Sequence, residues 1–494
     1  MSTAASQPIS PPALPSAVAA RSDFPTWLPP MLVKELRQGL RTRGFVGAFV
    51  VFQLLMALMM IGTVTSASLG NEAARAATAS TVNSFFWTLL TVQLLLVTPA
   101  RALGALQSEI DARTLDLLLL TRLTAWRVVV GKWASLVAQS ALLLVAMLPY
   151  GIVRYFGGSV DLVGDALTCL ALLGGCAVIT AIMLWASGLP KAVRIIVPVI
   201  AIFGGQRWRP LATGFSGPGF GYAITRPESA LLAFNGALVL VFFLVAAVRR
   251  IAPVAENHAL LARGLPLLAL LPVPFLSFLS TKAAAAGQLV FAGIFLGIVG
   301  MIELASLRLP MAAHWRVWAG RGTFGRFVGR FLLPGWPSAL LYVSLACVLV
   351  VTAAFFLGLP TPGEAQRVIW IALLALGALV LPAVALSLFE ARATKSPGAI
   401  YGLVFISLST FGAIAAAMSS MFPVKYTGFE SFARILPVSG LWLSLGRTEL
   451  DTPVMIGQAA FVGLVLFVAF VQSRLYWRSL ALHEVRDRTR GPDA

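Results

Sequence analysis

Charged side chains are scarce in this sequence. Asp, Glu, Lys and Arg make up 11% of the 494 residues, whereas 59% of the residues are hydrophobic. Soluble domains contain roughly one-quarter charged residues, and a soluble fold of this composition would have too little polar surface to cover its core. Apolar runs of about 20 residues recur between residues 45 and 472, and each is long enough to cross a bilayer as a helix. The sequence therefore predicts an all-α, polytopic integral membrane protein.

Cysteine and histidine are also rare. The three cysteines, Cys169, Cys176 and Cys347, lie inside apolar runs, which argues against a disulfide framework of the kind found in small secreted domains. The three histidines are far apart in the chain and do not have the spacing of metal ligands. We therefore expect no metal, no other cofactor and no catalytic site in this chain.

Acidic residues are outnumbered by basic ones, 19 to 37, which gives a formal net charge of +18. The basic residues lie between apolar runs and not on one amphipathic domain, so we do not expect nucleic acid as a partner. If the N-terminus is inside the cell, most of the Lys and Arg residues fall in cytoplasmic loops, as they do in membrane proteins generally. This bias predicts cytoplasmic N- and C-termini and a multi-pass protein of a plasma membrane, the inner membrane of a bacterium.

The apolar runs predict about twelve transmembrane helices. The fifth is too short to span alone, and it would re-enter the membrane if it continued into the glycine-rich stretch over residues 204–222. The twelve predicted ranges are 45–65, 84–104, 133–153, 166–187, 195–205, 229–248, 265–280, 286–307, 338–358, 368–389, 399–420 and 453–472.

Three parts of the chain differ in character. Residues 1–30 are rich in proline and small residues and have no continuous apolar core, which predicts a disordered cytoplasmic tail and not a signal peptide. Residues 31–250 form a predicted six-helix unit, and residues 251–494 form a second six-helix half. Asp111 to Thr114 and Glu390 to Thr394 follow corresponding helices, so a degenerate duplication would explain the pattern, although predicted helices 7 and 8 have no counterpart.

A basic segment precedes the first predicted span. Three leucines recur at every fourth position from residue 32 to residue 40, whereas the charged residues occupy the other positions, a pattern typical of a short helix that lies in the headgroup layer. A basic flank that only orients the chain is the alternative interpretation. The candidate residues of this interfacial "elbow" helix are Lys34, Glu35, Arg37, Arg41 and Arg43.

A second segment, residues 108–132, connects predicted helices 2 and 3. Glu109 and Arg113 are four residues apart and can pair on one helical face, and the apolar run over residues 115–120 is too short to span the membrane. A charged turn followed by an apolar stretch predicts a stiff loop that protrudes into the cytoplasm. An ordinary solvated loop is the alternative, although this one is unusually apolar.

Together, these two segments resemble the permease subunits of ATP-binding-cassette type-2 exporters. In that family a Lys-Glu-Leu-Arg elbow precedes helix 1, and an acidic turn, a Thr-Leu-Glu/Asp-x-Leu-Leu stretch and a Gly-Lys pair precede helix 3. The chain departs from the family at Arg113, often Gly, and at Arg122, often Pro. The matching positions are Lys34, Glu35, Leu36, Arg37, Glu109, Thr114, Leu115, Asp116, Leu118, Leu119, Thr121, Gly131 and Lys132.

The resemblance covers about half of the chain, and it implies a six-helix unit whose loop between helices 2 and 3 touches a cytoplasmic ATPase. Six-helix permeases of this type work as pairs, so a chain of twelve helices either acts alone or pairs with a second permease copy. The other expected partners are the ATPase and the lipid bilayer. The residues that it assigns to the ATPase-coupling loop are Glu109, Asp111, Arg113, Thr114, Asp116 and Arg122.

Two further absences fit a transport subunit that is not itself an enzyme. No Gly-x4-Gly-Lys-Ser/Thr phosphate loop occurs in the chain, so ATP would be bound by a separate subunit. Ionisable residues are almost missing from the apolar runs, which disfavours an ion-coupled secondary transporter, the first alternative. Glu303 is the one acidic residue well inside a run, and we interpret it as structural. A membrane-embedded transferase is the second alternative, but the predicted outer loops offer few acidic residues, and the sequence does not reveal the substrate.

Overall fold

The computed structural model describes a chain of helices. Its described residues are 30–69, 71–107, 124–156, 162–189, 227–253, 256, 258–279, 282–306, 318, 321–358, 362–389, 397–421, 433–445 and 452–489, and within these ranges there is no strand. Eleven helices in the described residues are long and apolar enough to cross a membrane. The chain is therefore an all-α, multi-pass membrane protein, because closed helices satisfy their own backbone hydrogen bonds in lipid.

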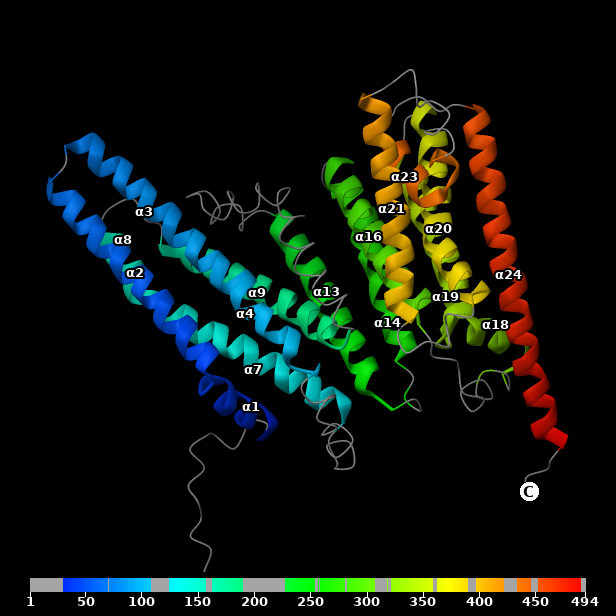
Figure 1. Cartoon of the computed structure of the whole chain (residues 1–494), viewed down its shortest axis with the longest axis horizontal. Coiled ribbons are helices and arrows are strands. Elements are labelled where there is room, and N and C mark those ends of the chain that lie inside the picture. Colours follow the sequence, from blue (N-terminus) through cyan, green and yellow to red (C-terminus); the bar gives the residue numbers. More distant parts are fainter. Residues whose placement is uncertain are drawn as a thin grey trace, which may run out of the picture.

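The helices form two groups that meet at α13, and Figure 1 shows the first group leaning while most of the second stands upright. The first group contains α1 (Pro30–Leu40), α2 (Arg43–Leu69), α3 (Glu72–Val92), α4 (Thr98–Ala100), α7 (Ala125–Ala146), α8 (Leu148–Phe156), α9 (Leu162–Ser187) and α13 (Pro227–Ile251). The second group contains α14 (Ala259–Leu267), α15 (Pro272–Leu279), α16 (Lys282–Leu304), α18 (Gly322–Leu332), α19 (Trp336–Phe356), α20 (Pro362–Leu388), α21 (Pro397–Met421), α23 (Pro437–Leu445) and α24 (Thr452–Thr489).

Eleven of the twelve predicted spans have a counterpart among the eleven candidate spans. The fifth predicted span, residues 195–205, lies outside the described residues. The predicted third span begins eight residues too late, because α7 starts at Ala125. Arg127 and Lys132 interrupt the apolar run there, but Ala125, Val128 and Val129 are buried and continue the helix toward its N-terminus.

The second span contains an irregular turn directly before Pro99. Between α3 and α4 the chain forms a π-helical turn over Gln93–Val97, and Thr98 donates a hydrogen bond from its hydroxyl to the carbonyl of Gln93 at 2.9 Å. Pro99 follows at once and has no N–H to continue the regular ladder. Such a bulge lets the second span continue to residue 104 with its remaining carbonyls satisfied.

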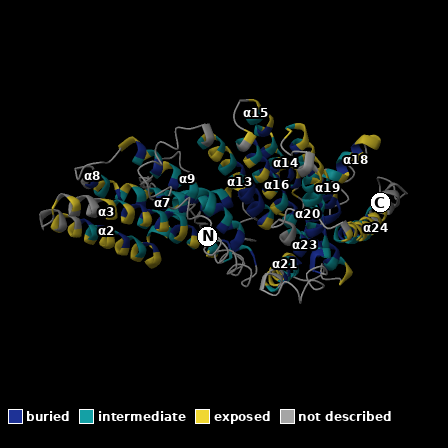
Figure 2. Ribbon diagram, turned by 90° about the horizontal axis from the view of Figure 1, so that it is seen from above, coloured by how far each residue is buried: buried dark blue, intermediate teal, exposed yellow. Residues whose placement is uncertain are grey.

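The two groups are joined along a seam between α13 and α16, which run in the same direction. Asn235 and Gln288 exchange two amide hydrogen bonds, of 2.7 and 3.0 Å. Seven residues further along each helix, Phe242 meets Phe295 edge to face at 5.5 Å. A spacing of seven is the repeat at which two helices keep facing each other. Figure 2 shows that the buried residues concentrate around this seam, with exposed residues on the rim.

Helix α9 also runs in the same direction as α13. Trp185 packs edge to face on Phe243 at 5.3 Å, and Arg250 donates to the carbonyl of Gly188 at 2.7 Å, so the two C-terminal ends lie together.

The short helix α23 is wedged between α20, α21 and α24. Glycines make this possible: a Cβ added to Gly412 of α21 would lie 2.6 Å from the Cβ of Ser439, and one added to Gly377 of α20 would lie 3.0 Å from Pro437. Gln458 of α24 donates to the carbonyl of Arg434 at 2.7 Å and accepts from the indole N–H of Trp370 at 2.7 Å. Sequence analysis did not anticipate this helix, because nine residues are too few to span.

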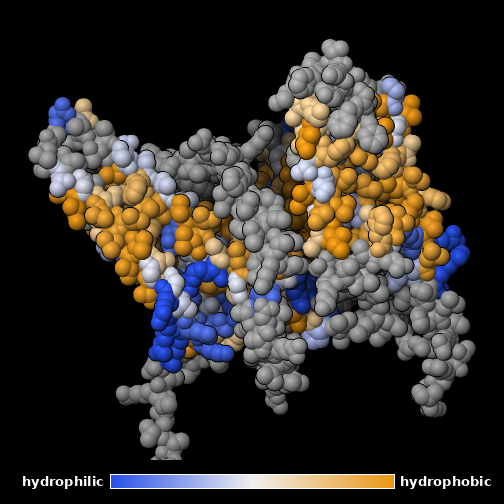
Figure 3. Space-filling model, in the orientation of Figure 1, coloured by the Kyte–Doolittle hydropathy of each residue, from blue (hydrophilic) through white to orange (hydrophobic). Residues whose placement is uncertain are grey.

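The distribution of hydrophobic residues on the surface indicates where the bilayer lies. A wide hydrophobic band runs across the middle of the molecule in Figure 3, with strongly hydrophilic residues below it at α1. The exposed side chains of Arg41 and Arg43 belong to this lower end, and α24 reaches the same end with exposed Arg474 and Arg478. We call it the basic end of the molecule.

Candidate functional site

Helix α1 lies against α7 at the basic end, in parallel register. A Cβ added to Gly131 would lie 3.1 Å from the side chain of Met31, which is itself buried, and eight residues along each helix Gly39 packs directly on Gln139. A helix covers Pro30–Leu40, the segment for which the elbow was predicted. The leucines of this helix are half-buried, because other parts of the protein cover them in part. The position of the helix in the headgroup layer stays a prediction.

An ion pair fixes this contact. Lys132 of α7 donates to Glu35 of α1 at 3.2 Å, and their side chains are 8% and 15% exposed. A lysine ammonium that is this far buried needs a compensating partner, because the cost of removing an ion from water is several kcal/mol. Glu35 provides that partner from a residue 97 positions away in the chain.

The corner between α1 and α2 is held by Thr42. Its hydroxyl donates to the carbonyl of Gly39 at 2.7 Å and accepts the backbone N–H of Phe45 at 3.4 Å, so it caps the N-terminus of α2. Arg101 donates to the same hydroxyl at 3.4 Å, and its guanidinium lies 5.1 Å from the ring centroid of Phe45. This arginine ties the end of the second span to the elbow corner.

The elbow candidates separate into two kinds. Lys34, Arg37, Arg41 and Arg43 are exposed, whereas Glu35 is mostly buried and pairs with Lys132 of α7. Sequence analysis placed all five in one interfacial group. Lys132, the partner of Glu35, was not predicted as a site residue, although it belongs to the Gly-Lys pair before helix 3.

The six coupling-loop candidates, Glu109, Asp111, Arg113, Thr114, Asp116 and Arg122, lie outside the described residues. Both ends of the segment that carries them are described. On the near side, the backbone N–H of Leu106 donates to the hydroxyl of Ser187 at 3.2 Å, which ties this end to α9. On the far side, α7 begins at the buried Ala125 and continues into its contact with α1. The segment is therefore attached to α9 at one end, and at the other end it continues into α7, which packs on α1.

We expect that replacing Glu35 by alanine lowers the free energy of unfolding by about 2 to 3 kcal/mol, because it removes one member of a buried charge pair. Reversible unfolding of the purified protein in detergent would measure the change. The control is Lys34→Ala, an exposed neighbour on the same helix, for which we expect a change within about 0.5 kcal/mol. Equal small effects for both variants would contradict the assigned role of the pair.

A second charged cluster lies at the basic end of the α13–α16 seam. Glu303 of α16 is 1% exposed and accepts hydrogen bonds from Arg249 of α13 and from Arg263 of α14, the latter at 2.9 and 3.1 Å. Arg263 also donates to the carbonyls of Phe331 at 2.6 Å and Gly335 at 3.3 Å. The Glu303 carboxylate therefore connects α13, α14 and α16, and Arg263 extends the cluster to α18, which supports the structural interpretation of Glu303.

A third polar cluster lies at the opposite end of the first group. Arg154 of α8 donates to Asn83 at 2.6 Å, pairs with Asp165 at 3.2 Å and stacks over Phe86 at 4.4 Å. Burial lowers the pKa of the Arg154 guanidinium, and the charge of Asp165 opposes that shift. Arginine stays protonated even so, because its ordinary pKa is above 12. The cluster holds α3, α8 and α9 together.

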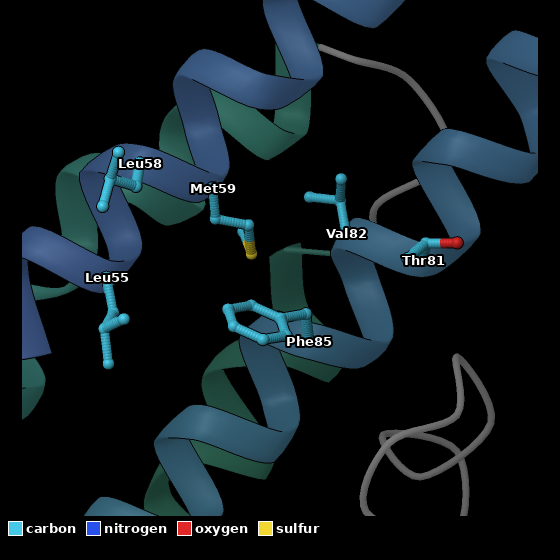
Figure 4. Close-up of a pocket in the computed structure, with 6 residues that line it drawn as sticks. All are labelled: Leu55, Leu58, Met59, Thr81, Val82 and Phe85. Atoms are coloured by element: carbon cyan, nitrogen blue, oxygen red, sulfur yellow. The ribbon is translucent and has the colours of Figure 1, made fainter.

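An open groove of about 370 Å³ lies between α2 and α3, as Figure 4 shows. Apart from the Thr81 hydroxyl its lining is apolar, and Leu58 and Phe85 also face outward. Such a surface accommodates lipid chains but offers few polar groups to orient a specific ligand. In the described residues no group of three or more His, Cys, Asp or Glu side chains could hold a metal ion. The groove is lined by Leu55, Leu58, Met59, Thr81, Val82 and Phe85.

Comparison with known proteins adds no relative: no protein-family profile, no curated protein and no solved structure matches this chain.

Proposed function

We propose that this chain is the membrane-spanning permease subunit of an ATP-driven exporter, powered by a separate cytoplasmic cassette ATPase, in the inner membrane of a bacterium and with both termini in the cytoplasm. One observation supports this most. The Lys-Glu-Leu-Arg segment and the Gly-Lys pair, which carry the family resemblance, pack on each other through Glu35 and Lys132. Segments that far apart in the sequence have no local reason to meet, so their pairing favours one functional unit.

The arrangement suits a coupling role for the loop over residues 108–123. Movement of a loop is transmitted to the rest of a protein through packed contacts and through the secondary-structure elements at its ends. Here one end is tied to α9 through Ser187, and the other continues into α7, which is held to α1. Movement of an ATPase against the loop would then displace α1, α7 and α9 together.

No observation in the described residues favours either of the two alternative functions. In an ion-coupled secondary transporter, an acidic residue within the membrane usually takes part in ion or proton movement. Glu303 already accepts hydrogen bonds from two arginines, which makes it a poor carrier of a proton. In a membrane-embedded transferase, acidic residues would gather at one interface. Asp165, the acidic residue near the outer end of α9, is engaged by Arg154.

The experiment that tests the proposal is charge reversal in the loop. Glu109→Arg places a positive charge where an acidic turn is expected to meet basic groups of the ATPase. Losing one member of a partly buried charge pair costs about 2 to 5 kcal/mol, which weakens a micromolar complex at least about thirtyfold. We expect the variant to lose co-purification of the ATPase, or to uncouple its hydrolysis, while the helix content is unchanged.

The matched control is Glu364→Arg, in the predicted outer loop and at the beginning of α20, which should affect neither assembly nor hydrolysis. If Glu109→Arg assembles with the ATPase and supports the same hydrolysis as the unmodified chain, the loop is only a connector between spans. The main support for the exporter assignment would then be lost.

A further inference from the structure

Helix α18 has an unusual surface for a helix at the end of a bundle. It is short and amphipathic, and on its outer side Phe324 and Phe327 are 79% and 71% exposed. The chain turns sharply after it, because Gly335 has φ +124° directly before α19. Figure 2 shows α18 projecting at the rim of the second group, beyond α19. Exposed aromatic residues on such a helix are typical of segments that lie in a membrane interface.

The contacts of α18 show its height relative to the bilayer. Leu333, directly after α18, packs on Trp477 of α24, and the guanidinium of Arg330 lies 5.7 Å from the centroid of the same ring. At this level the outer surface of α24 changes character. The apolar candidate span that includes most of α24 ends at Arg478, and Arg474 and Arg478 are exposed there beside the exposed Leu475. The hydrocarbon boundary and the position of α18 therefore coincide.

The positive charge of this surface determines which class of lipid it favours. Arg330, Arg474 and Arg478 converge on this level, and in the described part of the chain no carboxylate forms an ion pair with them. Guanidinium groups bind phosphate through paired, charge-assisted hydrogen bonds. Zwitterionic lipids carry a phosphate too, but their own cation offsets its charge. A basic surface at the headgroup level, next to exposed phenyl rings, therefore favours an anionic phospholipid over a zwitterionic one.

We propose that α18 and the adjoining part of α24 form a binding surface for anionic phospholipid, which we call the α18–α24 corner and define by Phe324, Phe327, Arg330, Arg474 and Arg478. The two phenylalanines insert among the acyl chains, and the three arginines hold the phosphate. This inference does not depend on the exporter assignment, since it requires only that the chain spans a membrane.

The test places a single fluorophore at the corner. Phe327 is replaced by cysteine in a chain whose Cys169, Cys176 and Cys347 are alanine, and the labelled protein is put into nanodiscs of phosphatidylcholine and phosphatidylglycerol in equal amounts. Either lipid carries bromine on its chains as a quencher. A single arginine at a membrane surface favours an anionic lipid about fivefold. We expect brominated phosphatidylglycerol to quench several times more strongly than brominated phosphatidylcholine.

The triple variant Arg330→Gln, Arg474→Gln, Arg478→Gln should bring this quenching ratio to about one. A fluorophore at Phe278, 90% exposed at the end of α15 and away from the corner, is the control and should report a ratio near one in both proteins. Equal quenching by the two lipids at position 327 in the parent would overturn the proposal. Strong quenching by aqueous iodide would also overturn the proposal, because it would indicate that the phenylalanines face water and form a surface for a protein partner.

A second measurement needs no cysteine variant. The unmodified chain is purified in mild detergent from membranes of the same two lipids, and its bound phospholipids are counted by mass spectrometry. Phosphatidylglycerol should be enriched about fivefold over phosphatidylcholine, and the triple arginine variant should lose the enrichment. An unenriched parent would contradict the proposal even if the labelled protein failed to fold.

Discussion

Glu303→Gln should destabilise the protein more than any other single replacement considered so far. The amide keeps the shape of the carboxylate but removes the one negative charge that, in the described part of the chain, pairs with Arg249 and Arg263. Removing one partner of a buried ion pair costs about 3 to 5 kcal/mol, because an uncompensated charge remains. We expect the purified variant to unfold at a much lower temperature, or to elute as aggregate, when its thermal unfolding and size-exclusion profile are measured.

Two further variants separate this effect from a general loss of charge. Glu256→Gln removes an exposed carboxylate that pairs with His258, and we expect a change within about 0.5 kcal/mol. Combining Glu303→Gln with Arg249→Gln should recover part of the lost stability, because one of the two uncompensated charges is removed. If Glu303→Gln is as stable as Glu256→Gln, the cluster does not hold the four helices together.

Gly412→Leu should also destabilise the protein strongly. An added side chain on Gly412 would meet both the Cβ and the Cα of Ser439 at 2.6 and 2.7 Å, and backbone atoms cannot move aside as a flexible side chain can. Overpacking of this kind commonly costs about 1 to 3 kcal/mol, and more where a backbone must shift. We expect α23 to be expelled from between α20 and α21, which limited proteolysis and thermal unfolding would detect.

Gly402→Leu is the matched control on the same helix, since no other atom lies within 4 Å of a Cβ added there. Its stability should be unchanged or slightly higher, because leucine favours a helix more than glycine does by about 1 kcal/mol. Comparable losses in the two variants would show that α21 rejects side chains in general and that α23 is not closely packed.

The spans could be predicted from the sequence because the bilayer imposes one simple requirement, a run of about 20 apolar residues. That rule locates helix interiors, and it fails where a helix continues past the bilayer. Helix α24 shows this, since its apolar run was predicted to end at residue 472 but the helix reaches Thr489. The end of a span follows from tertiary contacts, which an apolar run does not encode.

The candidate site was predictable only in part. The elbow helix follows from the spacing of its leucines, but its partner does not, because nothing local to Glu35 indicates a lysine 97 residues away. Burial of Lys132 could have been suspected, since a lysine in an otherwise apolar helical face requires a counter-charge. Similarly, Glu303 was recognised as an intramembrane acid, but its two arginines come from separate helices. Helix α23 gave no signal beyond the glycines that make room for it.

The most direct measurement of the central claim is ATP turnover by the purified chain in liposomes, alone and after a cassette ATPase has been added. The chain has no phosphate loop, so it should neither bind nor hydrolyse ATP by itself. With the ATPase bound, hydrolysis should appear and should depend on Glu109. ATP hydrolysis by the lone chain, once contaminating ATPases are excluded, would contradict the account, and so would transport driven by a proton or sodium gradient without ATP.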